Sequence, residues 1–188
     1  MSADQPDPRR LPDPVAEPAA YTQALFDLLG DRDPLEVQRE LPARLRAAIA
    51  GIADADLRRP ERPGKWSIAQ VIQHLADSEL VSGYRYRTCL AADGSRLAGY
   101  DQDAWAERLH YEETDVEAAI AELEALRGAN LRLLSRLADE EWERAGIHEE
   151  RGRESVRHLA RLLAGHDLAH LRQIERIKAT QGLAASAL

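Results

Sequence analysis

The sequence has 188 residues, a length that suits one domain with a substantial core, and it is rich in Ala, Leu, Arg and Glu, as helical proteins are. Its formal net charge of −8 argues against a nucleic-acid partner, because phosphate-backbone binding depends on clustered Lys and Arg. The single cysteine excludes an internal disulfide, no charged-then-apolar leader opens the sequence, and no apolar run is long enough to span a bilayer. We therefore expect a cytoplasmic protein with no membrane partner.

The first 18 residues differ in composition from the rest of the chain. Residues 1–18 are rich in proline and charge, which favours a flexible arm over a packed element. Residues 19–188 are expected to form the folded domain. A short helix is predicted over residues 19–29, and the next over residues 34–52, with a kink or break at Pro42 because proline removes a backbone donor.

Two capping boxes predict the starts of the next two long helices. Ser67 with Gln70 predicts a helix that runs to about residue 92, after a loop too rich in proline and glycine to be helical. A long irregular connection then leads to residue 113. Thr114 with Glu117 predicts the second start, and this charge-rich helix, ending near residue 137, is expected to present a solvated face.

A polar connection over residues 139–153 leads into the last helix, which Gly182 is expected to end. Four long helices separated by two long connections predict an all-α fold. The expected architecture is a four-helix bundle whose connectivity is not simply up-down-up-down. No strand-like alternation competes with this interpretation, and the three tryptophans are expected to pack near helix ends rather than bind a ligand.

Two histidines interrupt the apolar stripe of the last helix. His166 and His170 are one helical turn apart, so their side chains lie on the same face. Two buried imidazoles this close are either core histidines hydrogen-bonded to neighbours, or ligands that share one cation. The second interpretation needs a third ligand from another helix.

His74 is the best-placed third ligand, because it lies two turns into the helix that begins at Ser67 and close to the inward stripe of that helix. His158 shares the last helix with the pair but points roughly 80° away from His166 at 100° per residue. The remaining two histidines, His110 and His148, fall in connections. His74, His166 and His170 are therefore the predicted metal ligands.

Three segments of the chain resemble a known family. The run from Gly64 to Glu79 resembles the second-helix signature of the DinB-like superfamily, including its YfiT-like branch. Residues 166–174 resemble its final-helix signature, and residues 100–105 resemble its intervening loop. The order and spacing match over about residues 33–181. The resemblance implies a four-helix bundle that binds a divalent metal through His74, His166 and His170.

The resemblance also implies a metal-dependent hydrolase or a thiol-dependent transferase that acts on a small molecule. A low-molecular-weight thiol is one such partner. The resemblance further implies a homodimer. The expected cofactor is a divalent ion, with Zn or Ni favoured over Fe, Mn and Co. Three neutral nitrogens leave the ion most of its charge and an open position for water or substrate. No residue is assigned as catalytic. The alternative is a metal-stabilised bundle with a non-catalytic binding or stress-response role.

Other interpretations of single residues are weaker. The His-x-x-x-His spacing resembles a zincin motif with Asp167 in place of the glutamate base, but Asp is one methylene shorter and no histidine follows His170, which disfavours a peptidase. Cys89 is expected to be a small core residue. Residues 84–87, Tyr-Arg-Tyr-Arg, either line a cleft for an anionic substrate or decorate the surface.

Overall fold

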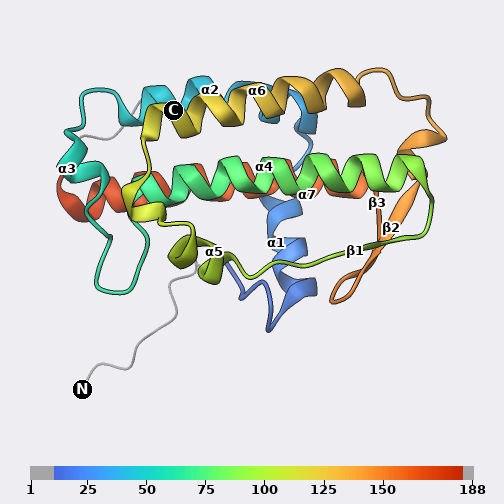
Figure 1. Ribbon diagram of the computed structural model, residues 1–188, viewed down its shortest axis with the longest axis horizontal. Helices are drawn as coiled ribbons and strands as arrows, with labels where there is room; N and C mark the ends of the chain where they lie inside the picture. The colour runs from blue at the N-terminus through green and yellow to red at the C-terminus, as the bar shows by residue number, and fades with distance from the viewer. Residues whose placement is uncertain (1–10, 184–188) are drawn as a thin grey trace.

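The computed structural model describes residues 11–183, and helices dominate it (Figure 1). The predicted arm lies mostly outside the described residues, which begin at Leu11. The helices and two short 3-10 turns, in chain order, are α1 (Pro18–Leu29), α2 (Pro34–Ile49), α3 (Asp54–Leu57), α4 (Ile68–Ala91), α5 (Gln102–Arg108), η1 (Tyr111–Glu113), α6 (Val116–Leu134), η2 (Glu141–Glu143) and α7 (Val156–Gln181).

The four long helices α2, α4, α6 and α7 form the predicted bundle, and their connectivity is not simply up-down-up-down. Helix α4 packs beside α6 and α7, and α2 packs beside the same two helices. Thus α2 and α4, which follow one another among the long helices, are diagonal, and so are α6 and α7. The two diagonal steps are made by residues 50–67 and 135–155, and the other long connection, residues 92–115, joins the neighbouring helices α4 and α6.

Local signals set most helix ends. The predicted capping box is present at the start of α4: the Ser67 hydroxyl accepts from the Gln70 backbone, and the Gln70 side chain accepts from the Ser67 backbone. Helix α7 ends at Gly182, whose φ of 72° suits glycine. The start of α6 was predicted one residue early, because Asp115 and not Thr114 caps it by accepting from Ala118 N.

Pro42 does not break α2, which is one continuous helix in the structure. A proline at this position removes the donor that would bond the carbonyl four residues earlier, at Gln38. The side chain of Arg127 on α6 replaces it, since Arg127 Nη1 donates to the Gln38 carbonyl at 2.7 Å. A contact between helices therefore satisfies the carbonyl that the sequence alone leaves open.

A small three-stranded sheet lies at one end of the bundle, where no strand was predicted (Figure 1). Its strands are β1 (Ser95–Leu97), β2 (Ala145–His148) and β3 (Gly152–Ser155). Strand β1 pairs in parallel with β2, with Arg96 opposite Ile147, and β2 pairs antiparallel with β3. Strands of three and four residues are too short to show alternation, and one of the two pairings joins segments far apart in the chain. The short helices α3 and α5 were missed for the same reason of length.

Helix α1 lies outside the bundle and crosses α7 (Figure 1). The two helices meet at Gly165, where an added Cβ would clash with the Leu25 backbone carbonyl. Only glycine permits this approach. Helix α1 therefore packs closely against α7, and its Tyr21 and Leu28 line a cleft that also includes His170.

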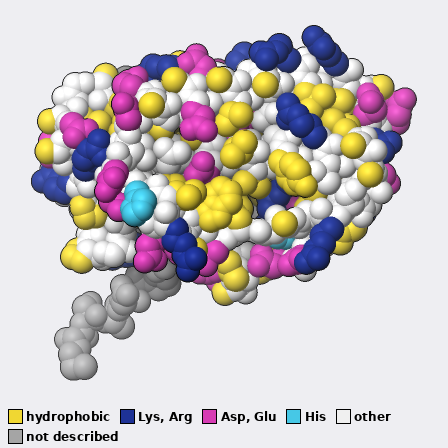
Figure 2. All heavy atoms as spheres, viewed as in Figure 1, with side chains coloured by type: hydrophobic (Ala, Val, Ile, Leu, Met, Phe, Trp, Pro, Cys, Tyr) yellow, Lys and Arg dark blue, Asp and Glu magenta, His cyan; other side chains and the backbone are white. Residues whose placement is uncertain are grey.

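Acidic and basic side chains are interspersed around the face of the molecule shown in Figure 2, and hydrophobic side chains gather in its middle. The exposed apolar residues of α4 include Leu80 and Tyr84. Over residues 11–183, none of the helices combines the length and the apolar composition that crossing a bilayer requires.

Candidate metal centre

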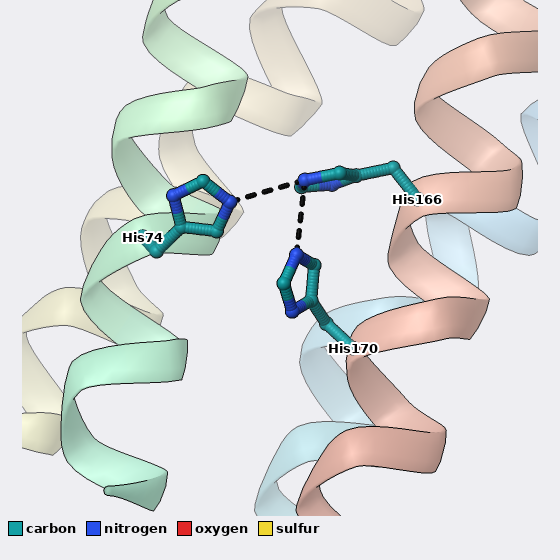
Figure 3. Close-up of side chains that lie close together, drawn as sticks. All are labelled: His74, His166 and His170. Atoms are coloured by element: carbon teal, nitrogen blue, oxygen red, sulfur yellow. Dashed lines mark hydrogen bonds between the residues drawn. The ribbon is translucent and has the colours of Figure 1, made fainter. Parts of the chain in front are cut away.

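The three predicted ligands meet between α4 and α7. His166 Nε2 lies 3.1 Å from His74 Nε2 and 3.0 Å from His170 Nε2 (Figure 3). The capping box that starts α4 sets the rotation of that helix, and the one-turn spacing on α7 stacks the other two rings. One nitrogen from α4 and two from α7 therefore converge between the helices, as the sequence predicted.

The geometry of the three nitrogens fits a divalent ion. Nitrogens about 2.0–2.1 Å from a tetrahedral ion lie roughly 3.3–3.4 Å apart, and the two separations from His166 Nε2 are within a few tenths of an ångström of that value. All three ligand atoms lie within 4.8 Å of one another. The Nδ1 atoms of His74 and His166 are buried and have no hydrogen-bond partner in the structure. Hydrogen bonds alone satisfy three converging Nε2 atoms poorly, whereas one cation would accept a lone pair from each.

Side chains around the histidines fix their orientation. Gln173 Oε1 lies 2.8 Å from His170 Nδ1, which favours the tautomer with a proton on Nδ1 and leaves Nε2 free to bind a metal. The Trp66 ring packs against His74 at a centroid distance of 4.9 Å. The sequence analysis missed both contacts, although Gln173 lies three residues after His170, at the spacing where helical side chains meet.

Burial keeps the cluster neutral. Desolvation is the main cause that lowers the pKa of His74 and His166 well below 6.5, and the nearby His170 adds to the effect on both. Desolvation likewise lowers the pKa of His170 to about 4, partly offset by its bond to Gln173. Neutral imidazoles are the form that binds metal, so the fold holds these ligands ready near neutral pH.

A large cleft reaches the cluster at His170. Its volume is about 1150 Å³, and it lies between α7, α5, the loop before α4 and the N-terminal segment. Its walls are polar and apolar in similar measure and carry both charges. They include Leu11, Tyr21, Leu28, Glu61, Lys65, Trp66, Asp103, Glu107, His170, Arg172, Gln173 and Arg176. Such a cleft has room for a small molecule beside the histidines.

On the far side of His166, a buried ion network joins all four bundle helices. The Arg127 guanidinium on α6 donates to Glu79 on α4 at 2.6 Å, to Asp167 on α7 at 2.8 Å and to the Gln38 carbonyl on α2. Asn130 also donates to Glu79, at 2.7 Å. Asp167 is thus an ion-pair partner of Arg127 and does not belong to the cluster of possible metal ligands, which disfavours the peptidase interpretation.

The helix over residues 116–134 is not only a solvated face, because it carries the buried Arg127 and Asn130. These two residues continue the apolar spacing of Ile120 and Leu123 towards Leu134, and that placement is the signal the sequence analysis missed. Burial raises the pKa of Asp167 to about 6, against the opposing charge and hydrogen bond of Arg127.

The other histidines lie away from the cluster. His158 contacts the Phe26 ring and lies near Glu154. It is therefore outside the cluster, as its 80° offset from His166 around the helix predicted. His148 is buried beside Arg85, with its Nε2 3.4 Å from Arg85 Nη2. His110 lies in a grouping of exposed side chains with Glu112 and Glu113. Cys89 is buried in the core, as predicted.

Comparison with known proteins agrees with this geometry. The model of the DinB superfamily matches residues 39–174, most of the chain, and the match spans all three histidines. The chain belongs to the DinB superfamily. Helix α1 and the segment before it lie outside the matched range, so the DinB match does not cover one wall of the cleft.

Several members of the DinB superfamily are similar over most of their length. The Bacillus subtilis protein named "Putative metal-dependent hydrolase YfiT" is 30% identical over 146 residues, 76% of this chain and 82% of its own. A Geobacillus kaustophilus protein of the same description is 27% identical over 90% of this chain and 97% of its own. The solved YfiT structure, described as an unusual four-helix bundle, matches with a TM-score of 0.76 at 28% identity, covering 80% of this chain and 87% of that one.

Proposed function

We propose that this protein is a metal-dependent hydrolase of a small molecule, with a divalent ion held by His74, His166 and His170. The observation that carries the proposal is the convergence of three Nε2 atoms beside a cleft of about 1150 Å³. Similar proteins bear the name "Putative metal-dependent hydrolase", which supports the same chemistry here. Zn and Ni are the ions we expect first, then Fe, Mn or Co.

The donor set determines what such a centre can do. Among the described residues, the cluster of possible ligands contains three histidines and no carboxylate. A divalent ion bound by three neutral nitrogens keeps an open position and lowers the pKa of bound water towards ~7, or polarises a carbonyl. The Ser78 hydroxyl lies 3.3 Å from His74 Nε2 and 3.0 Å from the Tyr100 hydroxyl, so this pair can orient a group that reaches the histidines.

Turnover that follows the metal would test the proposal. The purified protein, the chelator-stripped protein and the reloaded protein should be assayed on a panel of esters, amides and phosphoesters. A second series should contain a low-molecular-weight thiol and an electrophilic acceptor. We expect hydrolysis that is lost on stripping, regained on reloading, absent in His166→Ala and unchanged in His158→Gln.

Two other outcomes would redirect the proposal. Turnover only in the presence of the thiol would assign the thiol-dependent transfer instead. Metal binding without turnover on any substrate, with a large loss of melting temperature on stripping, would support the metal-stabilised, non-catalytic bundle. The homodimer, the cytoplasmic location and the absence of a nucleic-acid partner stay predictions.

A further inference from the structure

One wall of the cleft that reaches His170 comes from the N-terminal part of the chain and carries no charge. We call it the N-terminal wall, and its members are Leu11, Pro12, Pro14, Tyr21 and Leu28. The charged residues that the structure shows lining the cleft belong to other elements, namely the loop before α4, helix α5, turn η1 and helix α7. The cleft therefore has one apolar side in otherwise charged surroundings.

Close packing holds the N-terminal wall against α7. A Cβ added at Gly165 would lie 2.4 Å from the Leu25 carbonyl oxygen, so the backbones of α1 and α7 approach closely. Leu28, three residues after Leu25, packs against a buried cluster that includes Leu168. Leu168 lies midway between the two histidine ligands of α7. The wall therefore lies along the stretch of α7 that carries these ligands.

A hydrogen-bonded turn holds the part of the wall that precedes α1. The Asp13 carboxylate accepts from the backbone N–H groups of Val15 and Ala16, at 2.9 and 2.8 Å. The Asp13 carbonyl accepts from the backbone of Glu17 at 2.9 Å. A proline on either side of Asp13 restricts the backbone further. A wall built in this way is already formed before a ligand arrives, which lowers the entropy cost of binding.

A second apolar surface of the same cleft touches a metal ligand. Trp66 lines the cleft and packs its ring against His74 at a centroid distance of 4.9 Å. Two of the charged lining residues satisfy each other, since Arg176 donates to Glu61 at 2.7 and 3.2 Å. Arg176 is six residues after His170, roughly 9 Å further along α7 at 1.5 Å per residue. Apolar surface is therefore available next to the histidines, nearer than this ion pair.

We propose that the N-terminal wall and Trp66 form a subsite for an apolar group of the substrate. The substrate class is then a small ester or amide whose hydrolysable bond bears an aliphatic chain or an aromatic ring. Such a group would remove apolar surface of the wall from water, whereas a charged group would lose its hydration there and gain no partner. The DinB match begins at residue 39, so this specificity is set by residues outside it. The inference rests on the proposed function, because it names the substrate class of the same cleft.

Alkyl hydroxamates test the subsite, because their head group binds a metal ion while the length of the alkyl chain varies. Calorimetry should compare acetohydroxamate, butyrohydroxamate and hexanohydroxamate on the full-length, Zn-loaded protein. A fully buried methylene is worth roughly fourfold in affinity, and we expect a gain of about twofold or more for each methylene added.

Substitutions in the wall should affect only the longer chains. We expect Leu28→Ser and Leu11→Ser each to weaken hexanohydroxamate about fivefold and to leave acetohydroxamate unchanged. Val15→Ser is the matched control, since Val15 belongs to the same segment but is 69% exposed and does not line the cleft. A variant that only disturbed the fold or the metal would weaken short and long hydroxamates alike.

Equal affinity for the three hydroxamates would overturn the subsite, and so would an equal loss for the short and the long one in both variants. If Leu28→Ser does not fold, Leu11→Ser carries the test by the same criterion. The two proposals fail separately. Metal-dependent hydrolysis together with hydroxamate affinity that ignores chain length would keep the hydrolase and overturn the subsite. If the protein binds no metal, 1-butanol and 1-hexanol replace the hydroxamates. Tighter binding of hexanol that Leu28→Ser weakens would then support the subsite, and equal or absent binding would overturn it.

Discussion

Removal of the Arg127 guanidinium should destabilise the bundle more than any exposed substitution. The Arg127→Met variant leaves Glu79 and Asp167 buried without their cation, and both side chains are fully buried in the structure. Breaking a buried pair in this way costs about 3–5 kcal/mol. For a chain of this length, 1 kcal/mol corresponds to roughly 2–4 °C, so the melting temperature should fall by roughly 6–20 °C.

The loss of stability in Arg127→Met should be larger at higher pH. Burial already raises the pKa of Asp167 to about 6, and removal of Arg127 raises it further. A carboxyl whose folded pKa is raised destabilises the fold while ionised, and this penalty is relieved as pH falls through the folded pKa. The difference in melting temperature between Arg127→Met and the unaltered protein should therefore be larger at pH 7.5 than at pH 5.5. The charge of Arg127 is also one of the causes that lower the pKa of His166, so its removal lessens the cost of that histidine at low pH and acts in the same direction.

Thermal unfolding followed by circular dichroism measures both quantities. Arg132→Met is the control, because it removes an exposed arginine from the same helix and should change stability by less than about 0.5 kcal/mol. Adding Asp167→Asn to Arg127→Met should restore part of the loss, since it removes one buried charge. A fall in melting temperature no larger than that of the control, or a difference that grows at pH 5.5, would refute the reasoning.

Three further outcomes follow from the structure. Gly165→Ala should lower stability by about 1–3 kcal/mol in denaturant unfolding, because its Cβ meets the Leu25 carbonyl, whereas Gly128→Ala, which meets only the flexible Arg132 side chain, should be neutral or stabilising. Gln173→Leu should weaken metal binding about 10–100-fold in a competition titration by freeing His170 Nδ1, and an unchanged affinity would show that Gln173 does not orient the ring. The metal-free protein should lose stability as pH falls from 6.5 towards about 4, because histidines in the unfolded chain take up protons before the folded cluster, whose pKa values are lowered, can do so. The fall in unfolding free energy per pH unit should be smaller in His170→Ala.

The convergence of the three histidines could be predicted from the sequence because its signals are local. Ser67 and Gln70 fix where α4 begins, and so fix the face on which His74 lies. The one-turn spacing of His166 and His170 fixes theirs. The family resemblance placed the same three residues together, and the structure brings their nitrogens to one point.

What the sequence did not show depends on contacts between distant segments. Arg127 satisfies the carbonyl that Pro42 leaves open on another helix, so α2 continues through the residue where the sequence predicted a kink or a break. The parallel pairing of β1 with β2 joins residues about 50 positions apart, with Ser95 opposite Gly146.

Metal content tests the central claim most directly. Purified protein and its His74→Ala, His166→Ala and His170→Ala variants should be analysed by mass spectrometry for bound metal and titrated with Zn and Ni, with His158→Gln as the control. We expect roughly one divalent ion per chain in the unaltered protein and the control, and a loss of affinity of more than about 100-fold in each of the three ligand variants. A protein that binds no divalent ion, or a His74→Ala variant that binds it as tightly as the control, would contradict the account.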